Sequence, residues 1–94
     1  MPTLHIEHPT QDFDTWKRAL DSDPAGRQRS GVRRYRVSRA GDDPNYVMID
    51  LEFDTQEQAE GLLRAMQAIW GRPDHGLTRS QQARIVQTVE MREL

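Results

Sequence analysis

The 94-residue sequence contains no cysteine, so neither a disulfide framework nor thiolate chemistry is available to it. It also lacks any run approaching the ~20 consecutive apolar residues that a membrane-spanning helix needs, which argues against a membrane partner. The first residues have neither a basic region nor a long apolar run. We therefore expect no signal peptide and a cytoplasmic location.

Motifs of several protein classes are missing as well. There is no glycine-rich phosphate loop, no Gly-x-Ser-x-Gly and no His-x-x-x-His. The formal net charge is −2, and few aromatic residues lie among the six arginines between Arg27 and Arg39. Strand alternation also separates those arginines onto two faces, so we expect no nucleic-acid partner.

The clearest element is a strand from Tyr46 to Phe53, in which the side chains alternate. A period of two over eight residues, with β-branched content, is typical of a strand that is buried on one face. The apolar face carries Val47, Ile49, Leu51 and Phe53. The opposite face carries Tyr46, Met48, Asp50 and Glu52.

An amphipathic helix follows this strand at once. Its apolar residues recur at steps of three and four, the period of one helical stripe: Ala59, Leu62, Leu63, Met66, Ile69 and Trp70. We expect Asp54 to be the N-cap, Glu57 to be its capping-box partner, and Gly71 followed by Pro73 to end the helix. The apolar face of the strand is the natural surface on which to bury this stripe.

A similar arrangement occurs forty residues earlier. Phe13-Asp14-Thr15-x-x-x-Ala19 matches Phe53-Asp54-Thr55-x-x-x-Ala59 at each fixed position, and an alternating stretch from Thr3 to His8 precedes it. Asp14 is the expected cap of this first helix, whose apolar positions include Phe13, Trp16 and Leu20. The agreement of context favours a structural half-repeat of strand and helix.

The remaining segments complete the order of elements. Val32 to Arg39 is predicted to be a strand in which Tyr35 and Val37 face the helices, and the turn formers from Gly41 to Asn45 predict a hairpin. Arg84 to Met91 is the expected last strand. The order βαββαβ predicts a single α+β domain over residues 1–94, with a ferredoxin-like, four-stranded antiparallel sheet that carries both helices on one face.

Several segments together point to a known family. They are Asp12-Phe-Asp-x-Trp-Lys17, Asp21 and Arg27, Gly31-Val-Arg-Arg-Tyr-Arg-Val37, Asp43-Pro44-Asn45, and Leu51-Glu-Phe-Asp-Thr-x-Glu-x-Ala59. With the short first strand, they resemble the dimeric α+β barrel superfamily and, within it, the antibiotic-biosynthesis-monooxygenase-like domains. The resemblance spans nearly the whole chain.

This resemblance implies a homodimer in which two sheets pack face to face across a two-fold axis, with a ligand cavity in each subunit. It implies the fold more specifically than an activity, because the superfamily includes oxygenases, isomerases, cyclases and haem-degrading enzymes. The haem-degrading members rely on an asparagine in the first strand, a tryptophan in the third strand and a histidine on the second helix. The first strand here offers His5 and Glu7 instead, and no tryptophan lies in the third strand. We expect neither haem nor another cofactor.

The polar face of the predicted sheet concentrates ionisable groups. His5 and Glu7 share it with Arg34, Arg36, Tyr46, Met48, Asp50 and Glu52. Charged groups that become buried need partners. One interpretation is therefore a set of cross-strand ion pairs, joining Arg34 and Arg36 to Asp50 and Glu52, that tunes a dimer interface.

A second interpretation is a binding or catalytic site. His5 and Glu7 are then the acid/base pair, and an arginine orients an anionic or enolic substrate. The candidate ligand-binding residues are Arg34, Arg36, Tyr46, Met48, Asp50 and Trp70, the last at a cavity mouth. A third interpretation is a metal site of His5 and Glu7 with Asp50 or Glu52, but a spacing of two along a strand is not diagnostic, and we expect no bound metal.

The two other histidines are weaker candidates. His8 precedes a proline at a strand end, where a surface or capping role is expected. His75 follows Asp74 in a loop, where a base oriented by Asp74 and a solvated loop residue are the alternatives.

Two functions from different classes stay open. One is a small cofactor-independent enzyme, monooxygenase-like or isomerase-like, that acts on a small organic molecule. The other is a non-catalytic dimeric ligand-binding or structural domain whose charged sheet face is the subunit interface. The sequence identifies neither a substrate nor a reaction.

Overall fold

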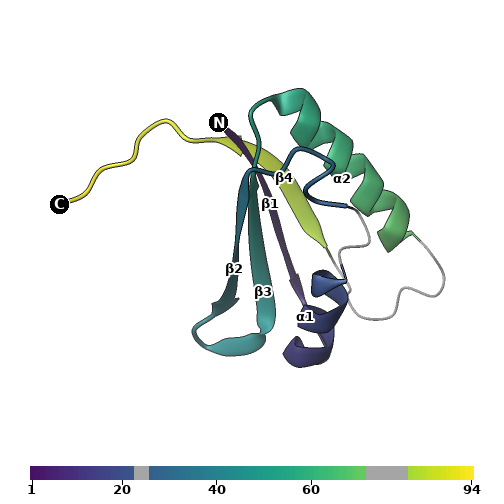
Figure 1. Cartoon of the computed structure of the whole chain (residues 1–94). Helices are drawn as coiled ribbons and strands as arrows, with labels where there is room; N and C mark the ends of the chain where they lie inside the picture. The colour runs from purple at the N-terminus through teal and green to yellow at the C-terminus, as the bar shows by residue number, and fades with distance from the viewer. Residues whose placement is uncertain (23–25, 72–80) are drawn as a thin grey trace.

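A computed structural model provides the structure of the chain and describes residues 1–22, 26–71 and 81–94. The elements are β1 (Pro2–Pro9), α1 (Phe13–Asp21), β2 (Arg34–Ala40), β3 (Asp43–Glu52), α2 (Gln56–Trp70) and β4 (Gln82–Gln87). The strands form an antiparallel sheet in the order β2-β3-β1-β4 (Figure 1). The predicted ferredoxin-like α+β fold is therefore confirmed.

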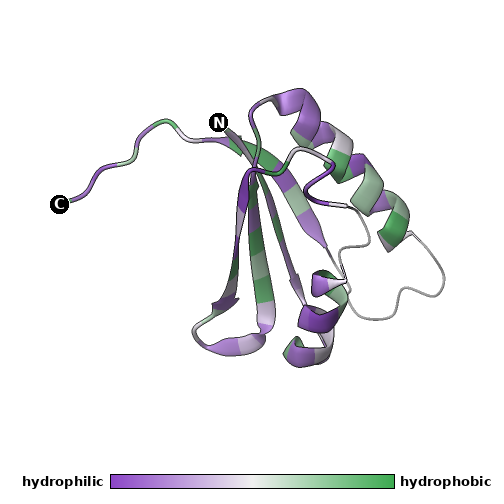
Figure 2. Cartoon of the chain, in the orientation of Figure 1, coloured by the Kyte–Doolittle hydropathy of each residue, from purple (hydrophilic) through white to green (hydrophobic). Residues whose placement is uncertain are grey.

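The core lies between the sheet and the helices. Leu4 and Ile6 of β1 are register partners of Leu51 and Ile49 of β3, so these four side chains point to one face. On that face α1 contacts β3, while α2 contacts β1 and β4 (Figure 1). Figure 2 shows the matching alternation of hydropathy along β3. The buried apolar set is Leu4, Ile6, Trp16, Val47, Ile49, Leu51, Phe53, Ala59 and Leu62.

The first helix begins earlier than predicted. Its N-cap is Asp12 rather than Asp14, and the Asp12 carboxylate accepts the backbone N–H of Thr15 at 3.0 Å. Asp14 lies inside the first turn, where its negative charge still favours the helix N-terminus. Sequence position alone did not separate these two aspartates, because they flank Phe13, the first residue of the apolar stripe.

The second helix is capped by Thr55, and the prediction of Asp54 and Glu57 was wrong. The Thr55 hydroxyl accepts the backbone N–H of Gln58 at 3.2 Å, and the Gln58 side-chain oxygen accepts the backbone N–H of Thr55 at 3.2 Å. This reciprocal pair is a capping box. Asp54 lies one residue too early, and its carboxylate pairs with Arg33 at 3.0 Å instead. Gly71 is the C-cap, as predicted.

The matching letters of the half-repeat occupy different helix positions. Phe13 is the first residue of α1, whereas Phe53 comes before α2, which begins at Gln56. The succession of strand, helix and strand does repeat, from β1 to β2 and from β3 to β4. The half-repeat is therefore one of topology, and the letter match does not align the two caps.

Several strand boundaries also differ from the prediction. β2 begins at Arg34 rather than at Val32, because a turn occupies the preceding residues. The Val32 N–H donates to the Arg27 carbonyl and closes this turn, and Gly31 within it has a φ of 97°. β3 begins at Asp43, so the turn shrinks to two residues beside an irregularity at Ala40. β4 ends at Gln87, and residues 88–94 extend away from the sheet without secondary structure (Figure 1).

No helix within the described parts of the chain is long and apolar enough to cross a membrane. The predicted helix stop at Pro73 and the two alternatives for His75 concern residues outside those the structure describes.

Candidate functional site

The sheet face opposite the helices, called the open face below, is built from rows of register partners on all four strands. The central row, from β2 to β4, is Arg36, Asp50, His5 and Arg84. The row on one side is Arg34, Glu52, Thr3 and Val86. The row on the other side is Ser38, Met48, Glu7 and Gln82. The predicted shared face is therefore confirmed by the strand register, and β4 adds residues to it.

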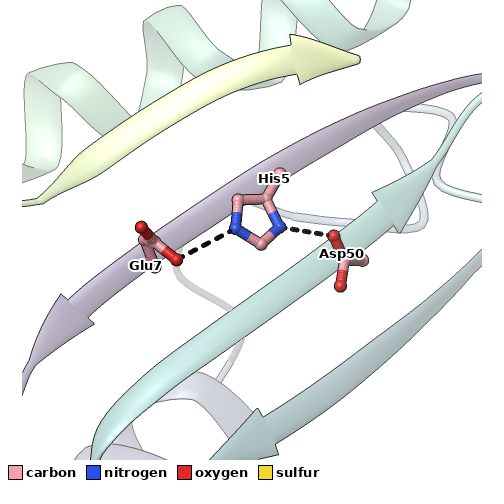
Figure 3. Close-up of polar contacts among 3 residues, drawn as sticks. All are labelled: His5, Glu7 and Asp50. Carbon is pink, nitrogen blue, oxygen red and sulfur yellow. Dashed lines mark hydrogen bonds and ion pairs between the residues drawn. The ribbon is translucent and has the colours of Figure 1, made fainter. Parts of the chain in front are cut away.

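His5 lies between two carboxylates at the centre of this face. Its Nδ1 is 2.6 Å from Asp50 Oδ1, and its Nε2 is 3.3 Å from Glu7 Oε2 (Figure 3). The His5 and Asp50 side chains are each about one-third exposed. The short contact fixes the ring through Nδ1, while the longer contact leaves Nε2 the more readily exchanged position.

The two carboxylates favour the charged imidazolium. The hydrogen bond to Asp50 is the largest cause that raises the pKa of His5 above its ordinary value. Partial burial of the ring opposes the increase, and the hydrogen bond to Glu7 adds to it. In the charged form both ring nitrogens donate, Nδ1 to Asp50 and Nε2 to Glu7.

Tyr46 and Met48 are near neighbours of Glu7 on the open face. Met48 is its register partner on β3, and Tyr46 is the partner of Pro9 in the next open-face row. The pKa of Tyr46 is raised, first by partial burial and then by the nearby Glu7 carboxylate. Glu7 therefore lies between the imidazole that it contacts and the phenol whose pKa it raises.

The arginines on β2 behave differently from one another. Arg34 forms an ion pair with Glu52, in which Nη2 lies 3.2 Å from Oε1, and this contact lowers the pKa of Glu52. Arg36 forms no ion pair with Asp50, although both are described and are register partners, because Asp50 turns to His5. The predicted ion-pair network is therefore correct for Arg34 and Glu52 and wrong for Arg36 and Asp50.

Two hollows mark the open face. One, of about 310 Å³, lies along β1 and β4 and is lined by His5, Glu7, Gln82, Ala83 and Arg84. Another, of about 550 Å³, is lined by residues on all four strands and in the C-terminal segment: Thr3, Arg34, Tyr35, Arg36, Asp50, Glu52, Val86, Thr88 and Met91.

The contribution of β4 was missed in the sequence. Gln82 precedes the expected start of the last strand, and Arg84 was assigned to it without a role. Alternation around Ile85, which packs toward the core, would have placed Gln82, Arg84 and Val86 on the opposite face.

Trp70 and His8 do not lie on the open face. Trp70, the last residue of α2, packs against the core on the helix-covered face. His8 also points to that face, is only 3% exposed, and meets Trp16 edge to face at a ring distance of 5.7 Å. The expected surface position of His8 is therefore wrong. Its position opposite Val47 places it over the first helix.

No group of three or more histidine, cysteine, aspartate or glutamate side chains within residues 1–22, 26–71 and 81–94 is arranged to hold a metal ion. Both His5 nitrogens face carboxylates that hydrogen-bond to them, so the donor set is that of a charge-paired imidazole.

Comparison with proteins of known structure supports the fold. A point mutant of SnoaB, a cofactor-independent oxygenase from Streptomyces nogalater, superposes with a TM-score of 0.67 at 13% identity over 96% of this chain and 94% of its own. Protein SO0527 from Shewanella oneidensis superposes with a TM-score of 0.69 at 18% identity, over 90% of this chain and 87% of its own. A dimeric ferredoxin-like protein from an uncultured marine organism superposes with a TM-score of 0.68 at 9% identity over the full length of both chains.

Other structural neighbours include an antibiotic biosynthesis monooxygenase, with a TM-score of 0.65 at 9% identity. No protein-family model matches the sequence, and no curated protein matches it. At sequence identities this low, the structural similarity establishes the fold and nothing more specific. The resemblance seen in the sequence is therefore confirmed at that level.

Proposed function

We propose that the chain is a small cofactor-independent enzyme, monooxygenase-like or isomerase-like, that removes a proton from a small organic substrate on the open face. His5 and Glu7 form the proton-transfer pair, and Asp50 is a positioning residue that acts through His5. The neighbouring fold of a cofactor-independent oxygenase supports this class of reaction. A cytoplasmic location stays a prediction from the sequence.

One observation carries the proposal. Asp50 has an arginine as its register partner on one side and a histidine on the other, and it hydrogen-bonds to the histidine at 2.6 Å. A face that served only to pair its permanent charges would favour the arginine, which is charged at every physiological pH. The chosen contact instead orients an imidazole, with Nε2 directed to Glu7 beside a hollow of about 310 Å³.

In this proposal Glu7 and His5 have different roles in the proton transfer. The Glu7 carboxylate accepts a proton from an acidic C–H or O–H of the substrate, and Nε2–H of the imidazolium donates to the oxygen that becomes negative. In an isomerase-like reaction the proton returns at another carbon. In a monooxygenase-like reaction the substrate is a methylene compound: dioxygen oxidises its anion, one oxygen atom becomes the new carbonyl, and the other leaves as water with the two hydrogens that the methylene loses.

A homodimer completes this proposal. The open face carries the candidate site and is covered by neither helix, so water reaches it in one chain. Packing two open faces together would exclude that water and strengthen each charged interaction. The dimeric neighbour with the same fold supports self-association of the chain.

Hydrogen–deuterium exchange tests the proton-transfer step without knowledge of the full reaction. A panel of enolisable ketones and phenols is incubated in D2O with the protein, and loss of the acidic C–H signal is followed by NMR. We expect at least one probe to exchange faster with the wild type, and His5→Gln and Glu7→Gln to remove that acceleration. Arg64→Gln, an exposed change on α2, is the matched control.

Two results would refute the proposal. Exchange that is equally fast in His5→Gln would place the chemistry elsewhere. A panel without acceleration, combined with loss of the dimer in Asp50→Ala and Arg36→Ala by sedimentation, would favour the non-catalytic domain whose charged face is its interface.

A further inference from the structure

Arg84 of β4 faces the proposed site and has no role in it so far. It is the register partner of His5 on the strand opposite Asp50, and it lines the 310 Å³ hollow with His5, Glu7 and Gln82. Within the part of the chain that the structure describes, no hydrogen bond or ion pair engages its guanidinium. Arg84 therefore offers planar, charged donors to whatever occupies the hollow.

The charges around His5 do not balance. The groups that face it on the open face are Asp50 on β3, Glu7 on β1, Arg36 on β2 and Arg84 on β4. With the imidazole charged, three cations stand against two carboxylates, and Arg34 and Glu52 neutralise each other next to them. One positive charge remains in excess, and a single anionic group would compensate it.

The position of that excess charge is specific. Asp50 and Glu7 are both engaged by the imidazole, and the hollow lies on the β4 side of His5, where Arg84 is the cation. Gln82, in the row of Glu7, adds an amide that donates or accepts without charge. An anion held there would lie within the same hollow as Nε2 and the Glu7 carboxylate.

We infer that the hollow binds a monoanionic organic ligand through a carboxylate, enolate or phenolate oxygen that pairs with Arg84. This inference rests on the proposed function for the role of the site and names its substrate class. The guanidinium fork suits a planar oxyanion, and pairing at Arg84 sets the neighbouring acidic C–H or O–H before Glu7. Neutral compounds of the same shape leave the excess charge uncompensated and bind more weakly.

Benzoate and benzamide form a pair of probes that differ in charge and share their shape. Binding of each to the full-length wild-type protein is followed by NMR, through the His5 ring signals and the backbone amides of β1 and β4. We expect benzoate to shift these signals in a saturable manner and benzamide to bind at least tenfold more weakly. Arg84→Gln weakens benzoate binding at least tenfold, whereas Arg64→Gln leaves it unchanged.

Sedimentation of each variant separates ligand binding from assembly. Arg84→Gln is expected to keep the association state of the wild type. Equal binding of benzoate and benzamide, or unchanged benzoate binding in Arg84→Gln, would overturn the inference. Loss of the dimer in Arg84→Gln would also overturn it, because Arg84 would then pair with a carboxylate of a second copy.

The binding experiment and the exchange experiment fail independently. Benzoate binding through Arg84 without any His5-dependent exchange would retain the anion site and refute the proposed enzyme. His5-dependent exchange of neutral probes that is insensitive to Arg84→Gln would retain the enzyme and refute the anion site.

Discussion

His5 and Asp50 are register partners on adjacent antiparallel strands, and their side chains meet at 2.6 Å on the open face. Directly opposed residues hold their Cβ atoms roughly 4.5–5.5 Å apart, so the pairing of two strands is enough to bring this imidazole to this carboxylate. The contact is therefore set by the central strands of the sheet and does not depend on a loop. Sites carried by such elements hold their geometry well.

The pKa of His5 should depend more on Asp50 than on Glu7. The hydrogen bond to Asp50 is the largest cause of the raised pKa, and Glu7 contributes less. In an NMR titration of the ring protons, we expect Asp50→Asn to lower the pKa of His5 further than Glu7→Gln does. The opposite order would show that Nε2, rather than Nδ1, makes the dominant contact.

The contribution of His5 to stability should fall as the pH rises. A pKa that is raised in the folded state adds stability that is fully present below the unfolded value of about 6.5 and is lost as the pH rises through the folded value. The difference in unfolding free energy between wild type and His5→Gln should be larger at about pH 5.5 than at about pH 8.5. Urea denaturation at both pH values measures it, and a difference that grows with pH would contradict the assignment.

Thr55 rather than Asp54 should limit the stability of α2. Thr55→Ala removes the hydroxyl of a complete capping box and is expected to cost about 1 kcal/mol. Asp54→Ala is the matched control, because it removes an exposed ion pair with Arg33 and no cap, and its cost should be smaller. Urea denaturation measures the loss of unfolding free energy in each variant. A larger loss for Asp54→Ala would indicate that Asp54, as the sequence predicted, is the N-cap of α2.

Adjacent leucines on α2 should differ in their contribution to the core. Leu62 is 1% exposed, and Leu62→Ala is expected to cost about 2–5 kcal/mol through lost burial and a residual cavity. Leu63 is only partly buried against the same core, so Leu63→Ala should cost less. Thermal and urea unfolding of both variants measure the ratio, and equal losses would place Leu63 deeper than the structure has it.

The fold was predictable because the decisive signals are local. The alternation in β3 and the stripe of α2 each identify an element and its buried face within a single stretch, as the burial of Ile49 and Leu62 shows. Helix starts were less predictable, since Asp12 and Asp14, or Asp54 and Thr55, compete within two residues. Which one caps depends on the path by which the chain enters the helix.

The site was predictable only in part, because its contacts depend on register. Alternation placed His5, Glu7, Arg36 and Asp50 on one face. Nothing local in the sequence says that Asp50 lies opposite His5, or that it bonds to His5 in preference to Arg36. Arg84 enters the site through the pairing of β4 with β1, a contact between residues far apart in the sequence.

The strand order gives the arginine-rich segment a second consequence. β2 is an edge strand, and an edge presents unpaired N–H and C=O groups on which further strands can grow. Arg34, Arg36 and Arg39 are exposed along it, and a charged edge of this kind discourages addition of a foreign strand. β4, the other edge, is six residues long and includes Gln82 and Arg84. The charged edge and the short edge therefore discourage edge-to-edge aggregation, while the broad open face is the surface that we propose for ordered association.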